Sequence, residues 1–158
     1  MNNLALMAYT NAQARQQLLD TVAEAIDELG SALEYLGEAY ERLDEHTADT
    51  LEQELFRPVQ VAYGRAQRTH AAFAERHELP TRVFEQAPQG APSHSVRELL
   101  DSAVDAVGRA DRTLSTLQDS MLPVEVGDAE LRAGLQDVRR LIGGLRGRAR
   151  ELVRTLGR

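Results

Sequence analysis

Large apolar residues recur at alternating intervals of three and four residues over three long segments of the chain. The rhythm is unbroken from Leu19 to Leu43, and it recurs from Val96 to Met121 and from Leu131 to Leu156. A repeat that averages 3.5 residues keeps one apolar stripe facing its neighbours over many helical turns, and it favours left-handed packing at shallow angles. The pattern therefore predicts three long amphipathic helices that pack side by side.

A fourth segment, from Leu51 to Phe73, carries a thinner apolar stripe at the same spacing. Pro58 lies near its start and removes one backbone donor, so we expect a kink there. A polar residue followed three positions later by glutamate, as in a capping box, predicts the start of this helix at Asp49 and of the next helix at Ser95. Asp128 is placed to cap the last helix. The sequence therefore predicts four helices.

These four helices group into two hairpins. The first covers about residues 10–78 and the second about residues 95–157, and the segment between them, 79–94, contains three prolines and a glycine. We expect an all-α fold, an antiparallel four-helix bundle built from the two hairpins with left-handed heptad packing, in a single domain of residues 1–158. The connector 79–94 either crosses over within one chain or allows hairpins to swap between chains.

The amino-acid composition excludes several kinds of catalytic and metal-binding site. The 158 residues contain no cysteine, and all 18 basic residues are arginine. Disulfides, thiolate metal sites, catalytic thiols and Schiff-base lysines are therefore excluded. The use of arginine alone is typical of a GC-rich bacterial genome. No apolar run approaches the roughly 18 residues of a membrane span, and no basic leader region begins the chain, so we expect a cytoplasmic protein without membrane contacts.

Charge is distributed unevenly along the chain. Residues 1–78 hold 14 acidic residues and 6 arginines, whereas residues 128–158 hold 4 acidic residues and 8 arginines. The last predicted helix is therefore basic in a protein whose net charge is −7. Six of its arginines are candidates for binding a partner: Arg132, Arg139, Arg140, Arg146, Arg150 and Arg154. Alternatively Arg132, Arg139 and Arg146, which are one heptad apart, pair with acids on neighbouring helices while the other arginines are solvated. The acidic balance of the whole chain argues against nucleic acid.

The first predicted helix, from about Thr10 to Asp44, is longer than the others, at roughly 50 Å against roughly 40 Å for the last two. The residues before it include four large apolar or aromatic side chains: Leu4, Leu6, Met7 and Tyr9. We expect this overhang to form a homodimer contact, with a frayed N-terminus as the alternative.

Four glycines lower the helical propensity of the last predicted helix, each by about 1 kcal/mol relative to alanine. They are Gly134, Gly143, Gly144 and Gly147. Either the backbone of a partner approaches them closely, or the helix bends or ends early at Gly143–Gly144.

A stripe of aromatic residues and histidines, ending in His70 and His77, runs along the second predicted helix at intervals of seven residues. With Arg65, the two histidines form an alternative site for a small molecule or a metal ion. Arg65 and His70 also resemble, in their spacing, the arginine and histidine of helical ribonucleases of the HEPN class. Ala66 departs from that pattern, because the class has a polar residue there. The simpler interpretation is that the stripe covers the edge of the bundle.

Signatures of the common catalytic bundles are missing. No histidine has an acidic residue three positions before it, as carboxylate-bridged di-iron bundles require. The residues after His70 differ from the lysine and glycine that follow a phosphotransfer histidine. We therefore expect no metal, no cofactor and no catalytic activity. The sequence favours a protein that acts through contacts with itself or another protein, made by its N-terminal overhang and its arginine-rich last helix.

Overall fold

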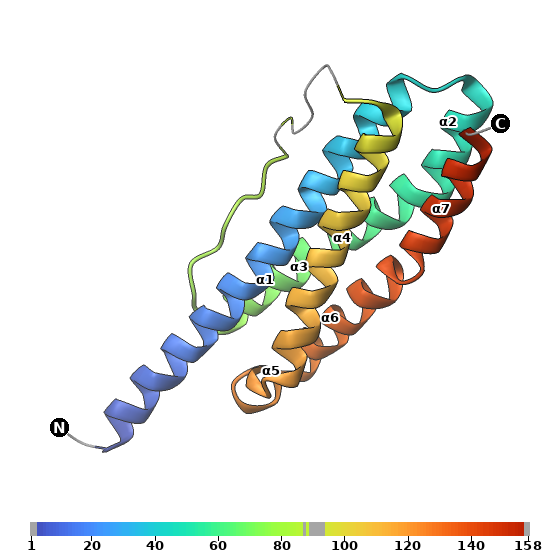
Figure 1. The fold of residues 1–158 in the computed structure, drawn as a ribbon. Helices are drawn as coiled ribbons and strands as arrows, with labels where there is room; N and C mark the ends of the chain where they lie inside the picture. Colours follow the sequence, from blue (N-terminus) through green and yellow to red (C-terminus); the bar gives the residue numbers. More distant parts are fainter. Residues whose placement is uncertain (1–2, 87, 89–93, 157–158) are drawn as a thin grey trace.

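The computed structural model describes residues 3–86, 88 and 94–156, with side chains from residue 10 onward. Within these residues the chain is helical and contains no strand, so the all-α prediction is confirmed (Figure 1). None of the described helices is long and apolar enough to cross a membrane. The elements follow in the order α1 (Asn3–Glu41), α2 (Glu45–Leu51), the π-helical turn η1 (Glu52–Phe56), α3 (Arg57–Arg76), α4 (Val96–Asp119), α5 (Leu122–Glu125), α6 (Ala129–Ile142) and α7 (Leu145–Leu156).

The long helices lie side by side and alternate in direction (Figure 1). Beyond its first turns, α1 packs against α4, which runs in the opposite direction, and α3 packs against α6 in the same way. α1 also packs against α3, whereas α4 packs much less closely against α6 and α7. The seam between α4 and the α6–α7 pair is therefore a loosely packed side of the molecule.

Buried apolar side chains from all the long helices form one continuous core. In α1 the predicted apolar stripe is buried from Leu19 to Leu36, while Tyr40 at its end is 41% exposed. The stripe of α4 is buried from Leu100 to Leu117, and Met121, which was predicted to extend it, lies beyond the helix and is 50% exposed. The 3.5-residue repeat thus identifies the core correctly except at helix ends, where no neighbouring turn covers the side chain.

The second predicted helix begins earlier than expected. Asp44 caps α2 and accepts a hydrogen bond from the backbone N–H of Thr47 at 2.9 Å, so the predicted start at Asp49 is wrong. α2 continues into η1, after which the N–H of Arg57 donates to a carbonyl five residues back. Pro58 lies in the first turn of α3, a helical position that tolerates its missing N–H. The irregularity expected at Pro58 is therefore a π-helical turn just before it.

The last predicted helix is broken into α6 and α7 at its glycine pair. α6 ends at Ile142, and Gly144 has a φ of +79°, in the left-handed region that glycine adopts without strain. A single helix from Leu131 to Leu156 is therefore wrong. The alternative of an early end at Gly143–Gly144 explains two of the four glycines.

The connector after α3 lies along α1 and α3 (Figure 1). Phe84 packs against the core, and Arg82 forms an ion pair of 3.0 Å with Asp27 of α1. Arg42, just after α1, donates a hydrogen bond to the carbonyl of His94. The described parts of the connector thus pack against helices of the same chain, and whether hairpins swap between chains stays a prediction to be tested.

α1 begins at Asn3, seven residues before its predicted start, and its first turns project beyond the ends of the other helices (Figure 1). Arg15 donates to the carbonyl of Val126 at 3.0 Å, which anchors α1 near the end of the helical body. The predicted homodimer contact of the overhang depends on side chains that lie outside the described part of the chain: Leu4, Leu6, Met7 and Tyr9.

Candidate partner-binding groove

Two of the six candidate arginines hold the chain together. Arg132 donates to the carbonyl of Pro123 at 3.1 Å, which ties the start of α6 to α5. Arg139 donates to the carboxylate of Asp111 at 2.9 Å and to the side-chain oxygen of Gln118 at 2.7 Å, both on α4. Both arginines therefore make contacts within the chain, but only Arg139 pairs with an acid on a neighbouring helix as the alternative predicted.

Two further candidates pair with acids on their own helices. Arg140 lies 3.3 Å from Asp137, and Arg154 lies 2.9 Å from Glu151. The arginine side chains are 74% and 69% exposed. Exposed pairs at this spacing contribute only about 0.3–0.5 kcal/mol, so either arginine is readily transferred to another acid.

The remaining candidates, Arg146 and Arg150, line an open groove of about 520 Å³ between α4 and α7. Neither has a hydrogen-bond or ion-pair partner among the described residues. A second hollow of about 290 Å³ at the α6–α7 break shares Val104 and Arg146 with it, so the groove continues along the loosely packed seam. The main groove is lined from both helices by Arg97, Leu100, Asp101, Val104, Asp105, Arg146, Ala149, Arg150, Val153 and Arg154.

The floor of the groove is apolar. Leu100 and Ala149 are buried at its base, and the half-buried side chains of Val104 and Val153 pack against the core from the two sides. Long arginine side chains cover such a floor with their aliphatic stems while their charged ends stay in water. The groove therefore offers both apolar contact area and mobile charge.

The two walls of the groove carry opposite charge. α4 contributes Asp101 and Asp105, whereas α7 contributes Arg146 and Arg150. Neither aspartate has a hydrogen bond or ion pair in the described part of the chain, and no ion pair there bridges the two walls. All four charges remain available for another molecule.

Sequence reasoning missed the α4 wall of this groove. Arg97, Asp101 and Asp105 recur every four residues, which places their side chains on one face of a helix. The basic wall on α7 has the same spacing. This signal is present in the sequence, but it does not identify the helix that lies opposite, because pairing depends on the packing of the whole chain.

The structure separates the three residues of the alternative ligand site. Arg65 pairs with Asp137 of α6 at 3.2 Å. His70 is buried next to the connector, with its ring centre 5.2 Å from that of Phe84. His77 instead contacts the loop before α6. Each side chain is engaged by a different element, so the three do not converge on one cleft.

The surroundings of His70 favour its neutral, unprotonated form. Burial lowers the pKa of His70 below its ordinary value of 6.5, and the positive charge of Arg82 lowers it further, against the opposing effect of Asp20. Its Nδ1 is buried without a hydrogen-bond partner in the described structure. No group of three or more histidine, aspartate or glutamate side chains among the described residues could hold a metal ion.

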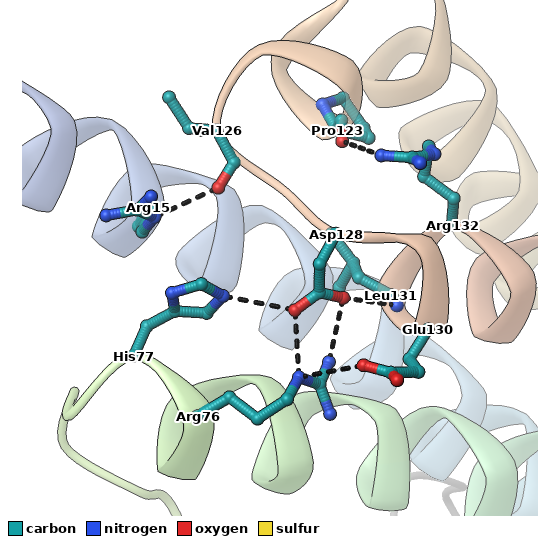
Figure 2. Close-up of polar contacts among 9 residues, drawn as sticks. All are labelled: Arg15, Arg76, His77, Pro123, Val126, Asp128, Glu130, Leu131 and Arg132. Carbon is teal, nitrogen blue, oxygen red and sulfur yellow. Dashed lines mark hydrogen bonds and ion pairs between the residues drawn. The ribbon is translucent and has the colours of Figure 1, made fainter.

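Arg76 and His77, at the C-terminal end of α3, take part in a cluster of polar contacts with the start of α6 (Figure 2). Arg76 donates two hydrogen bonds to the carboxylate of Asp128, at 2.8 and 2.9 Å, and Nε2 of His77 lies 3.1 Å from the same group. Asp128 also caps α6 by accepting from the N–H of Leu131 at 2.8 Å. Glu130 adds an ion pair to Arg76 at 3.2 Å. The carboxylate is thus fully used in joining α3 to α6.

Comparisons of the chain with protein-family models, curated proteins and solved structures found no match. The groove between α4 and α7 combines unpaired charges of both signs with an apolar floor, which makes it the candidate functional site.

Proposed function

We propose that this chain is a non-catalytic protein that acts through protein–protein contacts, beginning with association between two copies of itself. We further propose that its helices form an antiparallel four-helix bundle of two hairpins in a single domain, with left-handed heptad packing. The alternating helix directions and the continuous core support this architecture.

The groove between α4 and α7 is the observation that carries this function. Charged side chains without a partner in their own chain retain their attraction for another molecule, and they steer and orient its approach. An apolar floor beneath a charged rim is typical of protein interfaces. A ligand site would instead need convergent polar groups, and Arg65, His70 and His77 do not converge.

Sedimentation velocity of the full chain over a range of micromolar concentrations tests the self-association. We expect the sedimentation coefficient to rise with concentration toward that of a dimer, and light scattering to give a matching mass. A sedimentation coefficient that stays at the monomer value up to the highest concentration would contradict self-association.

A further inference from the structure

The opposite charges of the groove lie on the two helices that form its walls. α4 presents Asp101 and Asp105, α7 presents Arg146 and Arg150, and the two helices run in opposite directions (Figure 1). Arg146 lies near Gly108, since a Cβ built at this glycine would be 3.7 Å from its guanidinium. Asp105 is about one turn from Gly108, so Arg146 and Asp105 lie within about one turn of each other along the groove, as do Arg150 and Asp101, which are each four residues further along their helices.

A surface with one acidic and one basic wall is complementary to a copy of itself. A two-fold axis along the groove exchanges the walls, so that the acidic α4 of one copy lies over the basic α7 of the other, and the reverse. This rotation preserves helix direction, so the overlying helices are antiparallel. An axis across the groove would place α4 over α4 and α7 over α7, where like charges meet. The charge pattern therefore selects the first arrangement.

We propose that two copies of this chain associate through the α4–α7 groove, with the two-fold axis along it. The inference rests on the self-association proposed above and assigns it to a surface. α4 and α7 of both copies then surround the interface, and each is antiparallel to both of its neighbours. Val104 and Val153, half-buried in the single chain, lie at the centre and are covered by the same pair of the other copy. The interface thus repeats the packing inside the chain.

One end of the groove works against the dimer. Arg97 lies one turn before Asp101 on α4 and lines the groove together with Arg154 of α7, so the two arginines come within about one turn of each other between the copies. Glu151 pairs with Arg154 at 2.9 Å and offsets part of this repulsion. The favourable contacts are therefore centred on the two aspartates and on Arg146 and Arg150.

Charge reversal in matched pairs tests this surface. R146E/R150E makes the α7 wall acidic, and D101R/D105R makes the α4 wall basic, so either variant alone presents like charges across the two-fold axis. Four exposed charge pairs change from attraction to repulsion, so we expect the dimer dissociation constant of each variant to rise at least about tenfold. An equimolar mixture restores opposite charges on both sides and is expected to form a heterodimer with about wild-type affinity. Sedimentation equilibrium measures the dissociation constants of the two variants and of their mixture, in which one variant is fluorescently labelled.

Two further proteins complete the test. R57E/R68E changes the net charge by the same amount as R146E/R150E, on exposed α3 positions, and should associate like wild type. The quadruple variant D101R/D105R/R146E/R150E has a basic α4 wall and an acidic α7 wall, so its walls again carry opposite charge and it should form a homodimer. If all variants dimerise like wild type, or if the mixture does not regain the wild-type affinity, the α4–α7 groove is not the dimer interface. Self-association itself would not be contradicted by either result. A monomeric wild type would overturn self-association itself.

Discussion

Asp128 couples two helices through a single carboxylate. Burial raises its pKa, but hydrogen bonds from Arg76, from the N–H of Leu131 and from His77 outweigh burial and lower the pKa from 3.8 to about 2. Because the pKa is lower in the folded state, the stability that ionised Asp128 contributes is complete above about pH 4, and it is lost as the pH falls toward about 2. The shift corresponds to about 2 kcal/mol of unfolding free energy.

Asp128→Asn tests this coupling. Asparagine keeps an oxygen that can cap α6, but it loses the ionic hydrogen bonds to Arg76. We expect the free energy of unfolding at neutral pH to fall by about 2 kcal/mol, and its slope between about pH 4 and pH 2 to flatten. Urea denaturation followed by circular dichroism at several pH values measures both. Glu85→Gln, at an exposed connector position, is the control, and an unchanged acid slope in Asp128→Asn would contradict the assignment.

The burial of His70 predicts a second pH dependence of the folding stability. Burial, then the charge of Arg82, lowers the pKa of His70, and Asp20 opposes them, so the folded state binds a proton less readily than the unfolded state. Stability should therefore be complete above about pH 6.5 and fall on acidification below it. In His70→Leu, urea denaturation should show that this slope is lost. His46→Gln, at an exposed position of α2, should keep the slope, and a slope that survives in His70→Leu would contradict the prediction.

At the scale of helices, Gly134 sets how closely α6 approaches α3. A Cβ at this position would lie 2.2 Å from Oγ1 and 2.6 Å from Cγ2 of Thr69. Close approach of a partner was one of the two alternatives predicted for the glycines, and at Gly134 the element that approaches closely is α3 of the same chain, through the side chain of Thr69. This contact cannot be predicted from a helical pattern, because the pattern does not say which side chain of a neighbouring helix lies opposite the glycine.

Gly134→Ala should therefore lower the free energy of unfolding by about 1–3 kcal/mol, despite the higher helical propensity of alanine. Gly147→Ala on α7 is the matched control, because a Cβ there meets nothing within 4 Å, and it should raise the free energy by up to about 1 kcal/mol. Adding Thr69→Ala removes the two nearest atoms and should recover part of the loss. Urea denaturation measures each variant, and similar effects at the two glycines would contradict the close approach.

Apolar spacing predicted where the helices lie, but local hydrogen bonds decide where they begin and end. Thr47 offers both its N–H and its hydroxyl to Asp44, which makes Asp44 the cap of α2. A rule that looks for glutamate three residues onward selects Asp49 instead. Where the side chain and the rule agree, as at Ser95, the predicted cap is confirmed. The break at Gly144 was one of two predicted alternatives, and its positive φ explains why that alternative holds.

At the scale of the whole molecule, helix pairing decides which charges meet. The six candidate arginines look alike in the sequence, since all lie on one basic segment. The fold gives Arg132 and Arg139 internal acceptors, whereas it leaves Arg146 and Arg150 beside an open groove. An apolar stripe is compatible with several neighbours, so the position of α4 beside α7, and with it the acidic wall, could not be predicted from periodicity.

The proposed dimer also predicts a substitution that strengthens the association of the two copies. Arg97 lies near Arg154 of the other copy, so Arg97→Glu replaces repulsion by attraction in both symmetry-related pairs, which lie at the same end of the groove. We expect the dimer dissociation constant to fall about threefold to tenfold, as measured by sedimentation equilibrium. The gain should shrink at high salt, because the groups are exposed and screened. Arg68→Glu carries the same change in net charge on α3 and should give no gain. A dimer that Arg97→Glu weakens would contradict this axis, since an axis along the groove brings these two side chains close together.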